Sequence, residues 1–219
     1  MKRILVFGAG GHSKVVIDVA LVAGFSVIGI LDEKFPVGTT YCGIPILGRS
    51  GDLAQVVKET SVRQGVVAIG DNWIRARVVT RTLEAVPDFQ FPVLIHPSAV
   101  VASGVQVGAG SVVMAGSVVN PSSSIGIHCI LNTRASLDHD GSLGDYASIA
   151  PGCTVGGCVK VGSFSAIGLG ANLIHQIQIG EHTVIGAGAL VLGSIPDRVV
   201  AFGSPAKVIR TRTPGEAYL

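Results

Sequence analysis

The stretch IGIHCI LNTRAS LDHDGS LGDYAS IAPGCT V, residues 125–155, starts every block of six with an aliphatic residue and decides the fold. The same spacing runs without a slip from Ile95 to Val191, with small residues usually two positions before the aliphatic one. A period of six is neither the 3.6 residues of an α-helix nor the alternation of a long strand. It predicts short strands joined by corners and stacked into a parallel β-helix, whose interior the aliphatic residues fill.

Three hexads complete one triangular coil, so residues 18 positions apart are expected on the same face of successive coils. Adjacent coils are strand neighbours, about 4.8 Å apart. This arithmetic stacks Gly157 on His139 and His175 on Gly157. We expect the space over the glycine to stay open beside the His139 imidazole, with room for a thioester or an amine. An acidic partner would fix the ring's tautomer and raise its basicity, and the sequence offers both Asp138 and Asp140 for this role.

The N-terminal part reads as a βαβ unit. An apolar strand over residues 2–7 is followed by the glycine-rich turn 8–12, a helix over 14–23 and a second strand over 26–31. Asp32 and Glu33 stand where the ribose of a nucleotide would lie in such a unit. Ser13 stands at the position of the third glycine of the dinucleotide fingerprint. The alternative to nucleotide binding is a tight turn that only packs a helix on a sheet.

Later segments extend this α/β pattern. We predict a short strand over residues 44–47, a helix over 51–60 and a buried strand over 65–69. A second helix over 73–85 and a last strand over 89–94 follow. The loops at 8–12, 32–33 and 70–72 follow parallel strands, whose carboxyl ends share one edge of the sheet, so one ligand crevice is expected there. The expected domains are a Rossmann-like domain that binds a nucleotide, 1–94, and a β-helix with a C-terminal tail, 95–219.

Composition excludes several classes of protein. The 219 residues are 48% hydrophobic but only 5% aromatic, with a mean hydropathy of +0.58, as an aliphatic solenoid core requires. No apolar run reaches the roughly 20 residues of a membrane span. The first residues resemble a β-strand more than a signal peptide. A net charge of +2 provides no electrostatic footprint for nucleic acid. We therefore expect a cytoplasmic protein that binds neither membranes nor nucleic acids.

Each cysteine and histidine in the sequence could have a structural role instead of a functional one. The four cysteines show neither metal-ligand spacing nor a disulfide framework, and Cys129 and Cys153 occupy small-residue positions of the repeat. We expect His96, His128 and His182 at the surface or an interface, and His175 at a corner without chemistry. His139 is either a solvated corner residue or a catalytic one. A three-histidine zinc site is the rival, but no histidines show the required close spacing, and no Ser or Cys nucleophile signature appears.

The repeats and the ending FGSPAKVIR, residues 202–210, resemble the left-handed β-helix acyltransferases that use acetyl-CoA. Three further motifs resemble one branch of them: GAGGH at 8–12, AIGDNWIR at 68–75 and LNTRASLDHD at 131–140. That branch contains bacterial sugar O- and N-acetyltransferases, typified by sialic-acid O-acetyltransferase and the UDP-4-amino-sugar N-acetyltransferases. The resemblance covers essentially the whole chain and is not specific to one substrate.

The resemblance implies a homotrimer with acetyl-CoA in the groove between neighbouring β-helices. It assigns His139 as the catalytic base, Asp140 as the residue that raises its basicity, and the Gly157 N–H as the donor to the thioester carbonyl. The acetyl-CoA contacts fall at Ser148, Leu169 and Ala187, although the Ser148 position is a histidine in some relatives. The nucleotide-sugar contacts fall at Gly10, Gly11, His12, Asp32, Glu33 and Gly70.

The expected function is therefore acetyl-CoA-dependent N-acetylation of a nucleotide-linked amino sugar, for example a 4-amino-4,6-dideoxyhexose, in the synthesis of surface-glycan or lipopolysaccharide precursors. Transfer would be direct, with a histidine base and no metal. One alternative is O-acetylation of the sialic-acid type, and another is a catalytically silent β-helix that binds a nucleotide sugar. The sequence leaves open the nucleotide (UDP, GDP or dTDP), the sugar and the order of binding.

Overall fold

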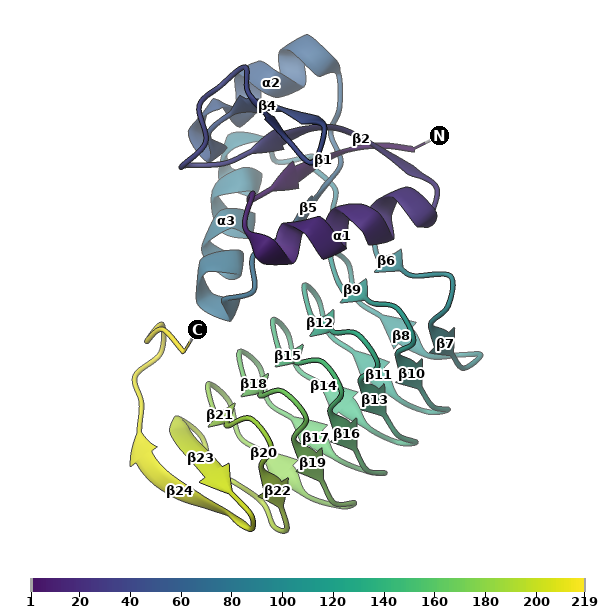
Figure 1. Cartoon of the computed structure of the whole chain (residues 1–219), viewed down its shortest axis with the longest axis vertical. Coiled ribbons are helices and arrows are strands. Elements are labelled where there is room, and N and C mark those ends of the chain that lie inside the picture. Colours follow the sequence, from purple (N-terminus) through teal and green to yellow (C-terminus); the bar gives the residue numbers. More distant parts are fainter. Residues whose placement is uncertain (1, 219) are drawn as a thin grey trace.

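The computed structural model describes residues 2–218. An α/β domain stands over one sheet of a long three-sided prism of short strands, and the end of the chain returns to the α/β domain (Figure 1). Both predicted architectures, the Rossmann-like domain and the left-handed β-helix of hexapeptide repeats, are confirmed. None of the helices in the described residues is long and apolar enough to cross a membrane.

The N-terminal sheet has the strand order β3-β4-β2-β1-β5 and is parallel except for β3. Its strands are β1 (Lys2–Phe7), β2 (Phe25–Leu31), β3 (Thr40–Tyr41), β4 (Ile44–Gly48) and β5 (Gly65–Val67). The helices are α1 (Gly11–Val22), α2 (Leu53–Thr60) and α3 (Asn72–Ala85), with a 3-10 turn η1 (Ser50–Asp52) before α2. Alternate side chains of β1 enter two cores: Ile4 and Val6 pack with α1, while Leu5 and Phe7 pack with α2 and α3.

One prediction about this domain is wrong. Residues 89–94 do not form a strand: only Gln90 makes a single bridge, to Gln64. Pro92 has no N–H for a ladder, and Phe89 and Phe91 instead pack as an aromatic cluster with Phe7. Leu94–Ile95 forms β6, which pairs with β9 of the β-helix. The division into domains 1–94 and 95–219 stays a prediction.

The β-helix consists of three parallel sheets. The six-stranded sheet contains β7 (Val100–Val101), β10 (Val118–Val119), β13 (Ser136–Leu137), β16 (Thr154–Val155), β19 (Asn172–Leu173) and β22 (Leu190–Val191). The five-stranded sheet contains β8 (Gln106–Val107), β11 (Ser124–Ile125), β14 (Ser142–Leu143), β17 (Lys160–Val161) and β20 (Gln178–Ile179). The eight-stranded sheet contains β6, β9 (Val112–Val113), β12 (Ile130–Leu131), β15 (Ser148–Ile149), β18 (Ala166–Ile167), β21 (Val184–Ile185), β23 (Val199–Gly203) and β24 (Ala206–Thr211).

The register between coils is the predicted 18 residues, because Val119 pairs with Leu137 and Leu137 with Val155. All three side chains are fully buried in the aliphatic core of the prism. Cys129 and Cys153, which occupy small-residue positions, are 1% exposed, so their assignment as packing residues is confirmed. All four cysteines are free thiols.

The corner between the five-stranded and eight-stranded sheets carries a column of stacked rings. His128, Tyr146, Phe164 and His182 stand 18 residues apart, all with positive φ, and adjacent ring centroids lie 4.8–5.3 Å apart. Of the two expected places for His128, the surface or an interface, the structure shows the interface, since this ring is 4% exposed beneath Phe91. Burial, followed by the charge of Arg75, lowers the His128 pKa to about 4, so the ring is neutral at pH 7.

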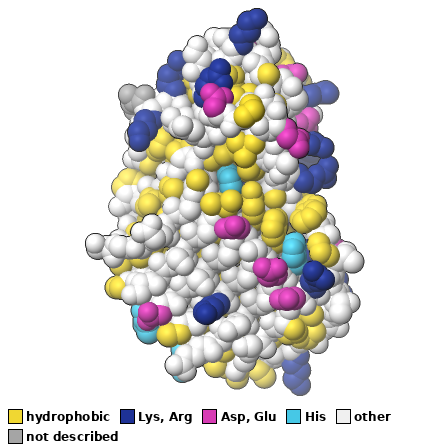
Figure 2. All heavy atoms as spheres, turned by 180° about the vertical axis from the view of Figure 1, so that it is seen from behind, with side chains coloured by type: hydrophobic (Ala, Val, Ile, Leu, Met, Phe, Trp, Pro, Cys, Tyr) yellow, Lys and Arg dark blue, Asp and Glu magenta, His cyan; other side chains and the backbone are white. Residues whose placement is uncertain are grey.

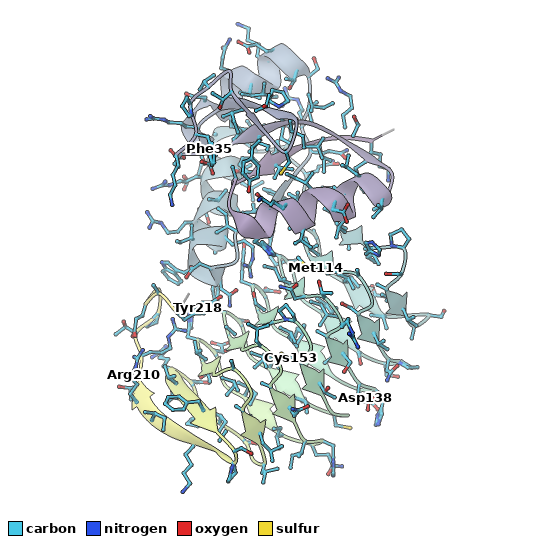
Figure 3. All side chains as sticks on the ribbon, viewed as in Figure 1. Phe35, Met114, Asp138, Cys153, Arg210 and Tyr218 are labelled. Atoms are coloured by element: carbon cyan, nitrogen blue, oxygen red, sulfur yellow. The ribbon has the colours of Figure 1, made fainter. Side chains whose placement is uncertain are left out.

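The eight-stranded sheet is the one that meets the N-terminal domain. Helix α1 lies between the N-terminal sheet and this sheet, because Val16 and Ala20 share one core with Val112, Met114 and Ile130. Figure 3 shows Met114 directly beneath α1. Across this junction, Figure 2 shows hydrophobic side chains gathered in a band on the back of the molecule. The two domains therefore share a continuous apolar contact.

Candidate active site

His139 lies at the corner between β13 and β14, where the chain passes from the six-stranded to the five-stranded sheet. Its Nδ1 is 2.8 Å from Asp140 Oδ2. A carboxylate can only accept, so Nδ1 carries the proton and Nε2 is left with a free lone pair. The hydrogen bond with Asp140, followed by the charge of Asp138, raises the His139 pKa. Nε2 is thus a strengthened base on an exposed corner.

The two neighbouring aspartates have different roles. Asp140 contacts the imidazole, whereas Asp138 Oδ1 accepts a hydrogen bond from the His139 backbone N–H at 2.8 Å and another from Asn120 Nδ2 at 2.6 Å. The alternative that the sequence leaves open is thereby resolved in favour of Asp140 as the ring's partner. Asp138 fixes the backbone of the corner instead, and these two hydrogen bonds lower its pKa.

Gly157 lies one coil beyond His139, as the 18-residue arithmetic predicts. A Cβ on Gly157 would be 2.6 Å from His139 Nε2, so the imidazole rests directly on the glycine backbone. The expectation of open space there is wrong: the absent side chain makes room for the His139 ring itself. The Gly157 N–H has no acceptor among residues 2–218 and remains available to a ligand. His175, the next residue in this stack, is exposed.

A thiol also belongs to this corner. Cys158 follows Gly157, and ligand atoms of His139, Asp140 and Cys158 all lie within 4.8 Å of one another. Spacing along the chain does not reveal this cluster, because Cys158 reaches Asp140 only through the 18-residue register between coils. No structural observation here tests the expectation that the site works without a metal, and it stays a prediction.

The predicted crevice of the N-terminal domain is divided in two. Gly8, Asp32 and Glu33 line a cavity of about 770 Å³ between the carboxyl ends of the strands, the 3-10 turn η1 and helix α3. The Asp32 carboxylate accepts hydrogen bonds from the backbone N–H groups of Ala9, Lys34 and Phe35 at 2.7–3.2 Å. Asp32 therefore joins the glycine-rich turn to the end of β2, whether or not it also contacts a ligand.

A second cavity, of about 410 Å³, lies between the N-terminal domain and the β-helix. Five of the predicted ligand-binding residues line it: His12, Gly70, Ser148, Leu169 and Ala187. The first two come from the α/β domain, and the other three from the eight-stranded sheet and its corner. Residues predicted for the nucleotide sugar and for acetyl-CoA thus meet at one cavity. Gly10 and Gly11 are exposed at the start of α1, where an added Cβ would meet nothing within 4 Å.

His12 is a titratable group that this cavity buries. Its Nε2 has no hydrogen-bond partner among the described residues. Burial, followed by the charge of Arg75, lowers the His12 pKa to about 4, so the ring is neutral at pH 7. A neutral imidazole with an unpaired nitrogen can bind a hydroxyl or an amine of a ligand.

Arg75, on α3, is the main site residue that the sequence analysis missed. Its side chain is 1% exposed and has no carboxylate partner within residues 2–218. The guanidinium donates instead to six acceptors in both domains, at 2.8–3.1 Å: the carbonyl oxygens of His128, Ile69, Gly70 and Tyr146, Asn72 Oδ1 and Ser148 Oγ. Burial lowers the Arg75 pKa. In the sequence, only the family motif at residues 68–75, which ends in Arg75, pointed to this residue.

Within a single chain, His139 does not lie at this cavity. The cavity lies on the eight-stranded sheet, whereas His139 is at the corner between the other two sheets. In Figure 3, Asp138, the neighbour of His139, is well separated from Tyr218, a residue of the cavity wall. The predicted site residues of the β-helix therefore form two groups on different sides of the prism.

Comparison with known proteins identifies the family. Residues 3–82 match the family model described as the PglD N-terminal domain. The UDP-N-acetylbacillosamine N-acetyltransferase of Bacillus subtilis is 36% identical over 120 residues, which are 52% of this chain and 52% of that protein. The match thus spans about half the length of this curated relative.

Two solved structures match almost completely. PerB from Caulobacter crescentus, in complex with CoA and GDP-perosamine, is 37% identical with a TM-score of 0.89, covering 94% of this chain and 97% of that one. The acetyltransferase domain of PglB from Neisseria gonorrhoeae, in complex with acetyl coenzyme A, is 35% identical with a TM-score of 0.86, covering 95% and 99%. The chain therefore belongs to the family of nucleotide-sugar N-acetyltransferases that join a PglD-type N-terminal domain to a left-handed β-helix.

Proposed function

We propose that the protein transfers the acetyl group of acetyl-CoA to the amine of a nucleotide-linked amino sugar, with His139 as the general base. The hydrogen bond of Asp140 to Nδ1, which leaves a basic Nε2 over Gly157, is the observation that carries this proposal. Support also comes from PerB and PglB, whose structures contain CoA with GDP-perosamine and acetyl-CoA, respectively. A glycan-precursor amino sugar is the substrate class that fits these relatives.

The proposed reaction is a direct transfer. The neutral amine attacks the thioester carbonyl, and His139 Nε2 takes the amine proton as the tetrahedral intermediate forms. The Gly157 N–H, which has no other acceptor among the described residues, donates to the developing oxyanion. Collapse of the intermediate breaks the carbon–sulfur bond, and the imidazolium returns a proton to the CoA thiolate. No covalent intermediate with the protein is needed.

We further propose that the working enzyme is a homotrimer whose active site includes residues of two chains. The separation of His139 from the cavity with His12, Ser148 and Leu169 supports this, because a neighbouring prism would bring the missing group. Sedimentation of the active protein at assay concentration measures the assembly directly. A fully active monomer contradicts this arrangement.

The activity is tested by assaying thiol release from acetyl-CoA with UDP-, GDP- and dTDP-linked 4-amino sugars, beside their 4-hydroxy counterparts. N-acetylation gives a base-stable amide, whereas O-acetylation of a hydroxyl gives an ester that mild base removes. Thiol release only with the 4-hydroxy sugars would contradict N-acetylation. If no acceptor gives thiol release, the result supports the alternative that the protein binds a nucleotide sugar but does not catalyse transfer.

Asp32→Ala tests the assignment of the nucleotide to the N-terminal domain. Asp32 ties the glycine-rich turn to β2 through the Ala9 N–H, so its loss disturbs the place where we expect the nucleotide. The KM for the nucleotide sugar should rise by about tenfold, the effect of one lost hydrogen bond to a charged group, while the KM for acetyl-CoA is unchanged. Steady-state kinetics with each substrate varied in turn measures both. A rise only in the acetyl-CoA KM assigns this domain another role.

A further inference from the structure

The last described residues, 212–218, form a C-terminal tail that runs from the β-helix back to the N-terminal domain (Figure 1). Arg212 begins it with a side chain that is 7% exposed. The Arg212 guanidinium donates to the His182 carbonyl oxygen at 3.1 Å and to that of Glu216, and it lies 5.4 Å from the centroid of the Tyr218 ring. The charge of Arg212 thus holds both the start and the end of the tail.

Two further contacts fix its path. Gly215 has a φ of +80°, and a Cβ there would lie 2.8 Å from Trp73 Nε1, so a glycine is required for the tail to pack on the indole. Arg210 Nη1 forms an ion pair with Glu216 Oε1 at 2.6 Å. Trp73 is in the first turn of α3, so the tail is docked on the N-terminal domain.

At its end the tail enters the cavity described above. Tyr218 lines this cavity with His12, Gly70 and Ser148. The Tyr218 hydroxyl donates to the Gly70 carbonyl oxygen and accepts from the Asn72 N–H, both at 3.2 Å. Burial raises the Tyr218 pKa, so the hydroxyl keeps its proton at neutral pH. One side chain therefore bridges the loop between β5 and α3 from a position 146 residues away.

We propose that the C-terminal tail is one wall of the acceptor pocket, and that Tyr218 is a specificity-determining residue that holds the 70–72 loop in place for the nucleotide-linked sugar. The proposal rests on the proposed function, since it assigns the side of this cavity that His12 and Gly70 line to the acceptor. Leu169 and Ala187 belong to the β-helix corner and do not depend on this loop. Loss of Tyr218 should therefore weaken binding of the nucleotide sugar more than binding of acetyl-CoA.

Tyr218→Phe and Tyr218→Ala test this in the full chain. The phenylalanine keeps the ring beside Arg212 but removes the hydroxyl, and the KM for the nucleotide sugar should rise by about 5- to 10-fold, the usual effect of one hydrogen bond. The alanine also removes the ring and should raise this KM further. The KM for acetyl-CoA should change by less than about twofold. Ala217→Ser, at the exposed neighbouring residue, is the matched control and should behave as wild type.

The position of the tail has its own reporter. Trp73 is the only tryptophan in the chain, and Gly215 covers its indole. Gly215→Ala should displace the tail, shift the Trp73 emission to longer wavelength and raise the nucleotide-sugar KM as Tyr218→Ala does. A shift in emission with an unchanged KM would overturn the proposal, and so would equal rises in both KM values.

Binding separates this proposal from the proposed function. Calorimetric titration with the nucleotide sugar alone, without acetyl-CoA, measures the Kd in wild type and in the Tyr218 variants. A weaker Kd in the variants supports the tail as a wall even where the wild type transfers no acetyl group. An active wild type whose Tyr218 variants keep both Kd and KM would refute the role of the tail and leave the proposed function intact.

Discussion

His139→Asn is expected to lower kcat by about 10²- to 10⁴-fold, the usual contribution of a general base. Asparagine keeps a polar side chain at the corner but has no basic nitrogen to replace the Nε2 that rests over Gly157. Because His139 is exposed and outside the core, stability and assembly should not change. Steady-state and single-turnover kinetics measure the loss, and sedimentation verifies the assembly. Turnover near the wild-type value would remove His139 from the mechanism.

The matched control is His175→Asn. His175 stands in the same column of residues, one coil beyond Gly157, and is also exposed, but it has no ion pair with a carboxylate in the described part of the chain. Its replacement should leave kcat unchanged. Gly157→Ala provides the complementary change, since its Cβ would lie 2.6 Å from Nε2 and force the His139 ring to move. It should lower kcat with the base still present.

The pH dependence of kcat/KM follows from the Asp140 contact. Asp140, with Asp138, raises the His139 pKa, and the reaction needs the unprotonated ring. Activity should therefore rise with pH, with a midpoint above the value of about 6.5 for an ordinary histidine. Asp140→Asn should move this midpoint to lower pH, because the carboxylate that stabilises the imidazolium is gone. It should also lower the plateau, because the base is weaker.

The β-helix and the pairing of His139 with Gly157 could be predicted because both are encoded locally. Each hexad of residues 95–191 specifies its own strand, and identical spacing then fixes which residues stack. The use of the space over Gly157 could not be predicted in the same way. It depends on the rotamer of His139, which the hydrogen bond to Asp140 selects.

The contacts between the two domains could not be predicted from the sequence for another reason. Arg75 contacts acceptors 53, 71 and 73 residues away, and Tyr218 contacts Gly70 across 148 residues. No periodic pattern relates such positions. The exposure of His128 also depends on a contact between distant residues. Its position in the repeat is that of a corner residue, but Phe91 of the preceding segment covers its ring.

Arg75→Met is the second large effect that we expect, and it concerns stability. Methionine is a similar length and apolar, but it leaves six acceptors from both domains without their donor. A buried acceptor left without its donor typically costs about 1–3 kcal/mol. Denaturant unfolding should show a loss of this size, with Arg77→Met, an exposed residue on the same helix, as the control.

Arg75→Lys separates charge from geometry. Lysine retains the positive charge but has three donors on one atom, so it cannot serve six acceptors spread over the two domains. If geometry dominates, Arg75→Lys should be nearly as destabilising as Arg75→Met. The His12 and His128 pKa values provide a second measurement: the charge of Arg75 lowers both, so Arg75→Met should raise them and Arg75→Lys should not. Histidine resonances titrated by NMR would show this. A stability loss below about 1 kcal/mol in Arg75→Met would mean that water or rearranged side chains satisfy these acceptors, and that apolar packing alone holds the two domains together.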